Sequence, residues 1–261
     1  MHKQDIDCGK EFDFGRVSGS YAQYRDIYPA SLYDKLHAMG IGRPGQCILD
    51  LGSGTGVLPR HLYTQGVQFT VTNISPEQIA AAKSLAATDG MDMSFRVCSA
   101  EETGFADGSF DIVTAVQCFR YFDTARAMPE IARVLVKDGR FCRIDMEWLP
   151  HEDEVAALTE QLVLRYNPQW TGGGFSGFRY CPPDWAEGRF ELETVHCWRE
   201  EAIPFTPEAW RGRIQTCHGV GASLSPAQAE RFDRELAAQL APYSKSLEIK
   251  HELQIELYRK L

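Results

Sequence analysis

The amino-acid sequence predicts a single α/β domain built on a doubly wound, mostly parallel β-sheet. Three observations support this prediction. Short apolar runs alternate with helix-like segments through residues 1–150, as in successive right-handed βαβ units. A glycine-rich turn directly follows the first of these runs, and an alternating apolar pattern closes the chain. A length of 261 residues is enough for one such core with an elaboration.

Five apolar runs within residues 1–150 are expected to form strands. The first, residues 47–51, is apolar except for Asp50 near its end, which is typical of a parallel strand that is buried on both faces. The other expected strands are residues 68–73, 93–98, 110–116 and 140–146.

Helices are expected between these runs, over residues 30–39, 57–63 and 125–135. A further helix is expected to begin at Ser75, because Ser75 is a good capping residue and Pro76 fits the first helical position. Gln78 completes a capping box with Ser75.

The pattern changes after Pro150. We expect a long helix, a glycine-rich stretch, a strand and two capped helices there, over residues 152–165, 171–174 and 190–198 and from Thr206 and Ser225. Residues 151–246 are therefore expected to form a helical, lid-like insertion on the core of residues 1–150. Residues 247–261 alternate between apolar and polar side chains, which predicts a final antiparallel strand within one domain of residues 1–261.

Composition and charge exclude several classes of protein. A net charge of −9 and a pI of about 5.3, without a basic stripe, argue against a nucleic-acid partner. No apolar window is long enough to cross a membrane, and the amino-terminal MHKQDIDCGKEFDFG lacks the apolar run of a secretory signal, so a soluble cytoplasmic protein is expected. The eight cysteines form no C-x-x-C pair, which argues against a metal cluster or a disulfide framework.

The turn after the first expected strand reads Asp50-Leu51-Gly52-Ser53-Gly54-Thr55-Gly56. A side chain at Gly52 or Gly54 would occupy space that a ligand needs, and a helix that starts near Gly56 directs free N–H groups towards that ligand. Dinucleotide binding is disfavoured, because its G-x-G-x-x-G spacing places the third glycine one residue later. A turn without a ligand is the other alternative, although three glycines within five residues exceed what such a turn requires.

The run CILDLGSGTGVLPRHL resembles the first motif of the class I S-adenosylmethionine-dependent methyltransferases. Downstream, VTNISPEQIAAAK resembles the second-strand motif of that family, with Asn73 at a usually acidic position, and Ser99-Ala100-Glu101 with FADGSFDIVTAVQC resembles the next two motifs. The segment Tyr21-Ala22-Gln23-Tyr24-Arg25 resembles the amino-terminal segment that closes over the cofactor. The resemblance covers residues 14–148 and implies a Rossmann-like sheet of seven strands, mostly parallel, with an antiparallel C-terminal strand.

The resemblance implies S-adenosylmethionine as the cofactor. Its methionine end would lie at the glycine turn, its ribose at the end of the second strand and its adenine beside the third-strand motif. Arg25 would pair with the cofactor carboxylate, and a solvated surface charge is the alternative for this residue. The implied cofactor contacts are Tyr21, Arg25, Gly52, Ser53, Gly54, Asn73, Ile74, Gln78, Ala100, Glu101 and Gln117.

The cofactor already carries an activated methyl group, so the alignment of an acceptor behind that carbon can supply about 7–11 kcal/mol and a dedicated base is optional. Tyr28 and His218 are the candidates for a catalytic group. No metal site is expected, and the sequence lacks the signatures of metalloproteases, serine hydrolases and P-loop enzymes. The residues expected to contact the acceptor are Arg120, Tyr121, Trp148 and Trp210.

The sequence therefore predicts methyl transfer from S-adenosylmethionine to a small-molecule acceptor by in-line displacement. Two alternatives remain open: a non-catalytic protein that binds S-adenosylmethionine or S-adenosylhomocysteine, and a transferase that uses a modified cofactor. Asn73 suggests the second alternative. The acceptor atom stays undetermined, and a homodimer is compatible with the sequence.

Overall fold

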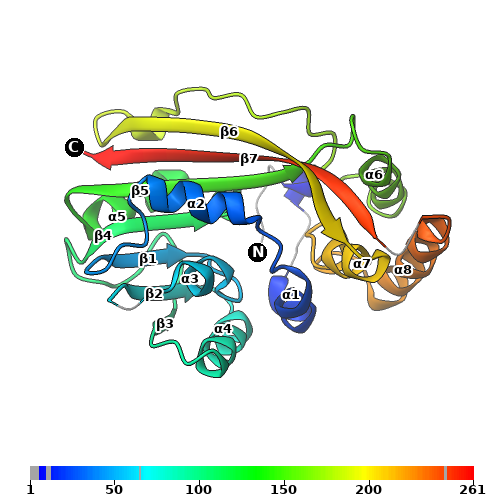
Figure 1. Ribbon diagram of the computed structural model, residues 1–261, viewed down its shortest axis with the longest axis horizontal. Helices are drawn as coiled ribbons and strands as arrows, with labels where there is room; N and C mark the ends of the chain where they lie inside the picture. Colours follow the sequence, from blue (N-terminus) through cyan, green and yellow to red (C-terminus); the bar gives the residue numbers. More distant parts are fainter. Residues whose placement is uncertain (1–5, 10–12, 65, 244–245) are drawn as a thin grey trace. The chain divides into compact units, whose positions relative to one another are not determined.

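The computed structural model describes residues 6–9, 13–64, 66–243 and 246–261. The amino-terminal stretch was predicted to lack the apolar run of a secretory signal. Its residues 1–5 and 10–12 lie outside the described residues. A seven-stranded sheet has the order β3-β2-β1-β4-β5-β7-β6 (Figure 1). Parallel pairs join β3 to β2, β2 to β1, β1 to β4 and β4 to β5, whereas the C-terminal strand β7 is antiparallel. The predicted α/β fold with a seven-stranded, mostly parallel sheet is confirmed.

Three of the strands coincide with the predicted apolar runs to the residue. Two strands are longer than expected, because β5 begins directly after the preceding helix and β6 continues past Trp198. In β5 the pairing with β4 shifts, because Phe110 pairs with Leu135 and Ile112 pairs with Arg140, so residues 136–139 form an irregularity within the strand. Asp138, in this stretch, has a left-handed φ of 59°. The strands are β1 Cys47–Leu51, β2 Gln68–Asn73, β3 Ser94–Val97, β4 Phe110–Val116, β5 Leu135–Trp148, β6 Phe190–Phe205 and β7 Leu247–Lys260.

The helix starts follow the predicted capping signals, except that the capping box predicted for Ser75 and Gln78 is not completed, because the N–H of Ser75 donates to Asn73 instead. The hydroxyl of Ser75 accepts a hydrogen bond from the N–H of Gln78, and Thr206 and Ser225 cap their helices in the same way. Both arms of a capping box are formed by Ser225 and Gln228. The helices are α1 Ser18–Tyr24, α2 Ala30–Ala38, α3 Val57–Leu62, α4 Pro76–Thr88, α5 Thr124–Val134, α6 Glu154–Tyr166, α7 Pro207–Gln215 and α8 Pro226–Leu240.

The chain divides into two compact units, and the division differs from the expected one. Unit 1 takes its described residues from Met1–Ile27, Met146–Phe178 and Trp198–Leu253, and unit 2 comprises Tyr28–Asp145, Arg179–Cys197 and Gln254–Leu261. The amino-terminal segment therefore groups with most of the expected lid. Residues 179–197, which were assigned to the lid, belong to the unit that contains the glycine turn.

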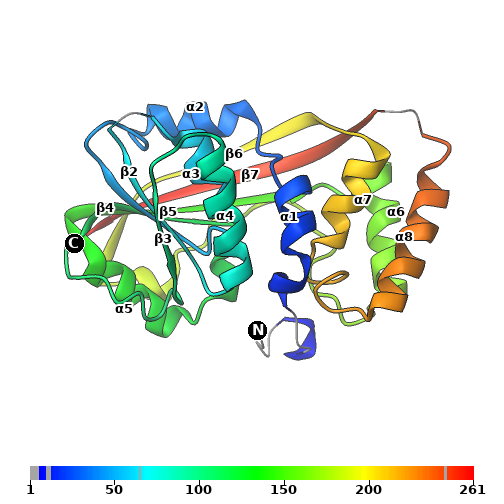
Figure 2. The same ribbon diagram turned by 90° about the horizontal axis from the view of Figure 1, so that it is seen from below.

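Unit 2 has an apolar core on both faces of its parallel strands. In Figure 2, α2 and α5 lie on opposite faces of the sheet. α5 buries one stripe, formed by Ala127, Met128, Ile131 and Val134, at the spacing of an amphipathic helix. This stripe joins the same hydrophobic cluster as the strand residues Val113, Ala115 and Phe141.

The helices of unit 1 pack on one another, α1 on α7, α7 on α8 and α6 on α8. Trp210 of α7 is 0% exposed, and its indole ring packs edge-on against Trp148 and Phe205. Gly212 of α7 lies directly against the ring of Tyr24, so any larger residue there would collide with α1. The core of unit 1 is therefore aromatic, and α1 approaches it closely.

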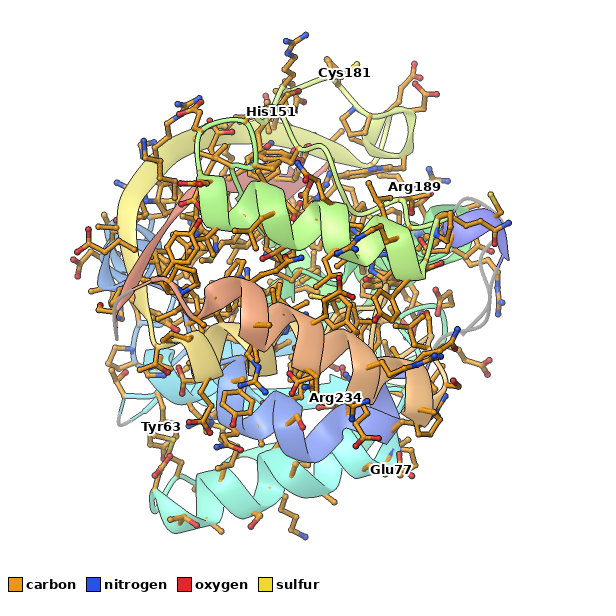
Figure 3. All side chains as sticks on the ribbon, turned by 90° about the vertical axis from the view of Figure 1, so that its right-hand side faces the viewer. Tyr63, Glu77, His151, Cys181, Arg189 and Arg234 are labelled. Atoms are coloured by element: carbon orange, nitrogen blue, oxygen red, sulfur yellow. The ribbon has the colours of Figure 1, made fainter. Side chains whose placement is uncertain are left out.

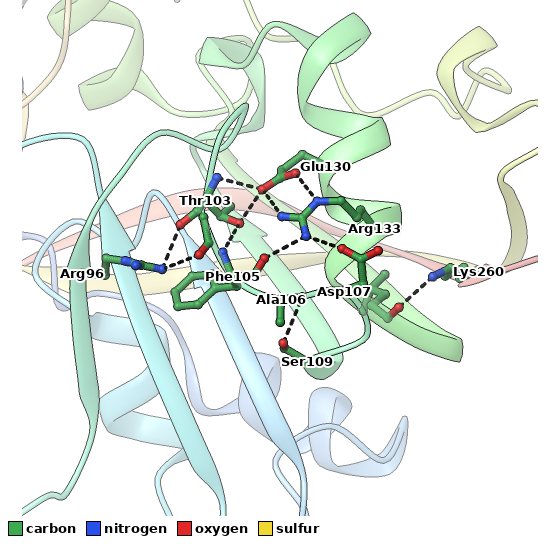
Figure 4. Close-up of polar contacts among 11 residues, drawn as sticks. Arg96, Thr103, Phe105, Ala106, Asp107, Ser109, Glu130, Arg133 and Lys260 are labelled. Atoms are coloured by element: carbon green, nitrogen blue, oxygen red, sulfur yellow. Dashed lines mark hydrogen bonds and ion pairs between the residues drawn. The ribbon is translucent and has the colours of Figure 1, made fainter.

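A polar network in unit 2 ties the loop before β4 to α5 (Figure 4). The N–H and the hydroxyl of Thr103 donate to Glu130 at 2.8 and 2.6 Å, and Arg133 donates to the same carboxylate at 2.8 Å. Arg133 also donates to the carbonyl of Phe105 and to Asp107. These hydrogen bonds, that from Arg133 first, lower the pKa of Glu130 from 4.5 to about 2.

We expect Glu130→Gln to remove stability that depends on pH. Because the pKa of Glu130 is lowered by folding, its contribution is complete above pH 4.5 and is lost as the pH falls towards 2. The variant should lose about 1–2 kcal/mol of unfolding free energy at pH 7, after allowance for the partly exposed Arg133, and little of that deficit should remain at pH 2.5. Urea denaturation at both pH values measures this.

The matched control is Glu230→Gln, which removes an exposed ion pair on α8 between Glu230 and Arg234. Figure 3 shows Arg234 at the surface of that helix. Exposed pairs of this kind contribute little to stability, so we expect no measurable change. Equal losses in the two variants would contradict the role of the network.

Candidate functional site

The glycine turn lies where the strand order of the sheet reverses. β1 is flanked by β2 on one side and by β4 on the other, so the connections from β1 and from β4 leave the sheet in opposite directions. In open α/β sheets, ligands bind in the crevice outside the carboxyl ends of the strands at such a point. The residues that follow β1, β2 and β4 therefore form the candidate site.

The turn has the backbone of a ligand-binding loop. Gly52, Gly54 and Gly56 have φ values of 60°, 58° and 73°, in the left-handed region that favours glycine. The N–H of Ser53 donates to the carbonyl of Thr72 at 2.8 Å, which fixes the turn to β2.

The space beside Gly52 is filled by protein. A Cβ atom on Gly52 would lie 2.9 Å from both Cβ and Sγ of Cys118, the second residue after β4. The thiol of Cys118 also donates to the carbonyl of Leu51 at 3.1 Å. This corrects the reason expected for Gly52: a side chain there would collide first with Cys118.

Asp50 lies buried beneath the turn. The hydroxyl of Thr114 donates to its carboxylate, and that of Thr72 donates to its backbone carbonyl at 3.0 Å. Burial raises the pKa of Asp50 from 3.8 to about 6, although the hydrogen bonds from Ser53 and Thr114 act in the opposite direction. At neutral pH the carboxylate is therefore charged, and burial of this charge in the folded protein is unfavourable.

Thr55, in the middle of the turn, is 0% exposed, and its hydroxyl has no hydrogen-bond partner among the described residues. A buried polar group is usually satisfied by protein, water or a ligand. The sequence analysis did not single out this residue. Its position between two glycines of the motif was the signal that could have identified it.

At the end of β2, the side chain of Asn73 shapes the turn into α4. Its carbonyl oxygen accepts a hydrogen bond from the N–H of Ser75 at 2.9 Å. Ile74 is 51% exposed, and Val97, at the end of the neighbouring strand β3, is 48% exposed. These two side chains offer an apolar surface at the site, and Val97 was not predicted. Gln78 lies buried in the first turn of α4.

The residues after β3 connect to the loop after β4. Ala100 is buried, and the carboxylate of Glu101 accepts a hydrogen bond from the N–H of Asp123 at 2.9 Å. Asp123 caps α5 with its side chain. Glu101 therefore anchors the start of α5 in addition to any contact with a cofactor.

Gln117 follows β4 with a left-handed φ of 58°. A residue other than glycine costs about 1–3 kcal/mol in such a conformation, which persists only where the surroundings hold it. Its N–H donates to the carbonyl of Ile144 on β5 at 2.9 Å. Arg120 is exposed and Tyr121 is half-buried in the short 3₁₀ helix Phe119–Tyr121.

The expected amino-terminal contacts fall in unit 1. The guanidinium of Arg25 donates to the hydroxyl of Thr216 at 2.7 Å and stacks 5.0 Å from the ring centroid of Tyr21. Arg25 is thus engaged with its own unit. Tyr28, a candidate catalytic residue, is half-buried at the start of unit 2.

The other candidates of unit 1 are buried within it. The indole N–H of Trp148 donates to Glu160 at 2.6 Å, and that of Trp210 donates to Thr159 at 3.0 Å. His218 is buried with its Nε2 3.4 Å from the carboxylate of Asp7. Contact with an acceptor at these three positions remains a prediction and would require unit 1 to open.

Neither a metal centre nor a membrane span is found in the described part of the chain. No group of three or more His, Cys, Asp or Glu residues there could hold a metal ion. Among the same residues, no helix is long and apolar enough to cross a membrane. All eight cysteines are free.

Residues 49–143 match the methyltransferase domain family. This part of the chain is therefore similar to methyltransferase domains. An uncharacterized methyltransferase of Mycobacterium tuberculosis is 32% identical over 151 residues, which are 56% of this chain and 56% of that protein. The demethylmenaquinone methyltransferase of Thermus thermophilus is 32% identical over 142 residues, 52% of this chain and 64% of that enzyme.

The fold also agrees with solved structures. The YcgJ protein of Bacillus subtilis has a TM-score of 0.53 and 21% sequence identity, and the match covers 88% of this chain and 98% of that protein. The matched part spans just over half the length of the mycobacterial relative.

We expect Asp50→Asn to stabilise the protein at neutral pH. Because folding raises the pKa of Asp50, its contribution to stability is complete below pH 3.8 and is lost as the pH rises through about 6. Removal of the charge should raise the unfolding free energy at pH 7 by about 1–3 kcal/mol and flatten its pH dependence between pH 4 and 6. Urea denaturation across that range is the measurement. The exposed Asp92→Asn serves as the control, and an Asp50→Asn variant that keeps the wild-type pH profile would refute the assignment.

Proposed function

We propose that this protein transfers a methyl group from S-adenosylmethionine to a small-molecule acceptor. The observation that carries the proposal is the left-handed turn of Gly52, Gly54 and Gly56 at the point where the strand order reverses. The match of residues 49–143 to the methyltransferase domain family supports it.

The residues around the turn fit this cofactor. The buried hydroxyl of Thr55 lacks a hydrogen-bond partner in the described part of the chain, and the exposed Ile74 and Val97 offer an apolar surface of the kind that an adenine ring covers. The Nδ2 group of Asn73 can donate to a ribose hydroxyl, because its Oδ1 atom is the one that accepts from Ser75.

We assign the cofactor contacts as follows. The backbone of the turn would hold the methionine end, Asn73 the ribose, and Ile74 with Ala100 the adenine. Gln117 would border both the cofactor and the acceptor. S-adenosylmethionine supplies the activated methyl group, and the chain contributes alignment of the acceptor behind it.

The acceptor would bind beside the loop that follows β4. Arg120 and Tyr121 lie in that loop and can donate hydrogen bonds to an acceptor oxygen. A small molecule is favoured because the chain has a net charge of −9 and because one relative is named for demethylmenaquinone. A protein that binds the cofactor without turnover is the alternative, and it would form no S-adenosylhomocysteine with any acceptor.

We expect Gly54→Leu to abolish binding of S-adenosylhomocysteine in titration calorimetry. Gly54 is buried in the turn, and a large side chain there would displace the backbone that holds the methionine end. The matched control is Gly90→Leu, because Gly90 has a similar φ of 67° and no atom within 4 Å of the added Cβ. The control should bind like the wild type. Wild-type affinity in Gly54→Leu would remove the turn from the site.

We expect Asn73→Asp to tighten S-adenosylmethionine binding several-fold. A carboxylate can accept from the ribose hydroxyls and still accept from the N–H of Ser75, and hydrogen bonds to charged groups are stronger by about 1 kcal/mol. Titration calorimetry and turnover on an identified acceptor measure the effect. Binding ten times weaker would contradict the ribose contact, whereas tighter binding with lost turnover would favour a cofactor or acceptor with extra negative charge.

A further inference from the structure

Three charged side chains meet beneath the loop that follows β4. We call Arg143 and Asp145 of β5 and Glu256 of β7 the Arg143 triad; the two strands lie side by side (Figure 1). The Nε of Arg143 donates to Asp145 at 2.8 Å, and its Nη1 lies 3.7 Å from a carboxylate oxygen of Glu256. The side chains of both acids are only 7% exposed, whereas that of Arg143 is 29% exposed.

The carboxylate of Glu256 is fixed by further hydrogen bonds. The hydroxyl of Tyr258 donates to it at 2.7 Å, and the side-chain amide of Gln254 donates to its other oxygen. Arg143 is therefore held at two edges by acids, of which Glu256 is itself fixed by hydrogen bonds. The face of its guanidinium lies against Phe119, with 5.1 Å between Cζ and the ring centroid.

Phe119 belongs to the loop that borders the candidate site. Arg143 pairs with Ala115 in the sheet, and the N–H of Gln117 donates to the carbonyl of Ile144, so the triad lies where β4 ends. Between Gln117 and Phe119 stands Cys118, which fills the space beside Gly52. A continuous path of contacts thus runs from the triad through Phe119 and Cys118 to the glycine turn.

Stability of the fold does not explain the triad. The side chains around Phe119 are aromatic, and Phe141 and Trp185 pack directly on it. Apolar residues in place of buried ion pairs are often neutral or stabilising, because two charges must lose their hydration. In this triad two buried acids share one arginine.

The loop above the triad contains a strained residue. Gln117 has a left-handed φ of 58°, and such a conformation persists only where the surrounding structure holds it.

We infer that Arg143 is a positioning residue, which acts through Phe119 to hold residues 117–122 against the glycine turn in the geometry that cofactor binding requires. This inference rests on the proposed function. Arg143 suits the role because its planar guanidinium can pair with two acids at its edges and stack on an aromatic ring with its face. Lysine would keep the charge but would lose the stacked, forked geometry.

The test compares affinity for S-adenosylhomocysteine with thermal stability. We expect Arg143→Met to bind on the order of tenfold more weakly than the wild type, and Arg143→Lys to recover part of the loss. Phe119→Leu, which leaves no buried charge unpaired, should weaken binding in the same direction. Titration calorimetry at a temperature well below each melting point separates a loss of affinity from partial unfolding.

Two further variants keep the test decisive. Arg259→Met removes an arginine three residues after Glu256 on β7 that pairs with Asp138 and Glu191 instead of the triad, and it should bind like the wild type. If Arg143→Met does not fold, the triple variant Arg143→Met, Asp145→Asn, Glu256→Gln removes all three charges together and should fold but bind weakly.

The outcomes distinguish the inference from the proposed function. A wild-type protein that does not bind S-adenosylhomocysteine would overturn both. Wild-type affinity in Phe119→Leu and in the folded Arg143 variants, with only the melting temperature lowered, would overturn the inference alone.

Discussion

The contact between Gly52 and Cys118 is the constraint on which the candidate site depends. It brings the turn after β1 and the loop after β4 together where the strand order reverses, with no room for even one additional methyl group. The left-handed turn, the strained Gln117 and the buried Asp50 all lie within a few residues of this contact. The geometry of the site is therefore set by the close approach of two strand ends, which a larger residue at either position would force apart.

Unit 2 buries charged side chains that its apolar core does not require for stability. Asp50 lies beneath the glycine turn with its pKa raised by burial to about 6, and burial followed by the charges of Asp50 and Asp145 raises the pKa of the Cys118 thiol. The Arg143 triad lies under the adjacent loop. Such groups reduce stability or leave it unchanged, and they fix the positions of the loops that carry them. This arrangement fits a site that must be ordered before its ligand arrives.

The two units carry different parts of the proposed function. Apart from Gln78 in α4, the predicted cofactor contacts of unit 2 follow the ends of β1, β2, β3 and β4. Tyr21 and Arg25 belong to unit 1, and the acceptor candidates are divided, with Trp148 and Trp210 in unit 1 and Arg120 and Tyr121 in unit 2. In unit 1, Arg25 bonds to Thr216, and Trp210 lies fully buried in an aromatic core. Trp148 and Trp210, the side chains of unit 1 that were expected to contact an acceptor, pack and form hydrogen bonds within that unit.

The sequence by itself determined the parallel core and the place of the glycine turn. Residues 47–51, 68–73 and 110–116 form strands as predicted, because local apolar runs and turn residues specify buried strands, and Ser75, Thr206 and Ser225 begin helices because capping is local. Only the tertiary structure decided that Cys118 fills the space beside Gly52, that β5 is irregular over residues 136–139 and that Trp148 and Trp210 are buried. It also decided that Arg143 and Asp145 meet Glu256. These features arise from contacts between segments far apart in the chain, which no local pattern of residues encodes.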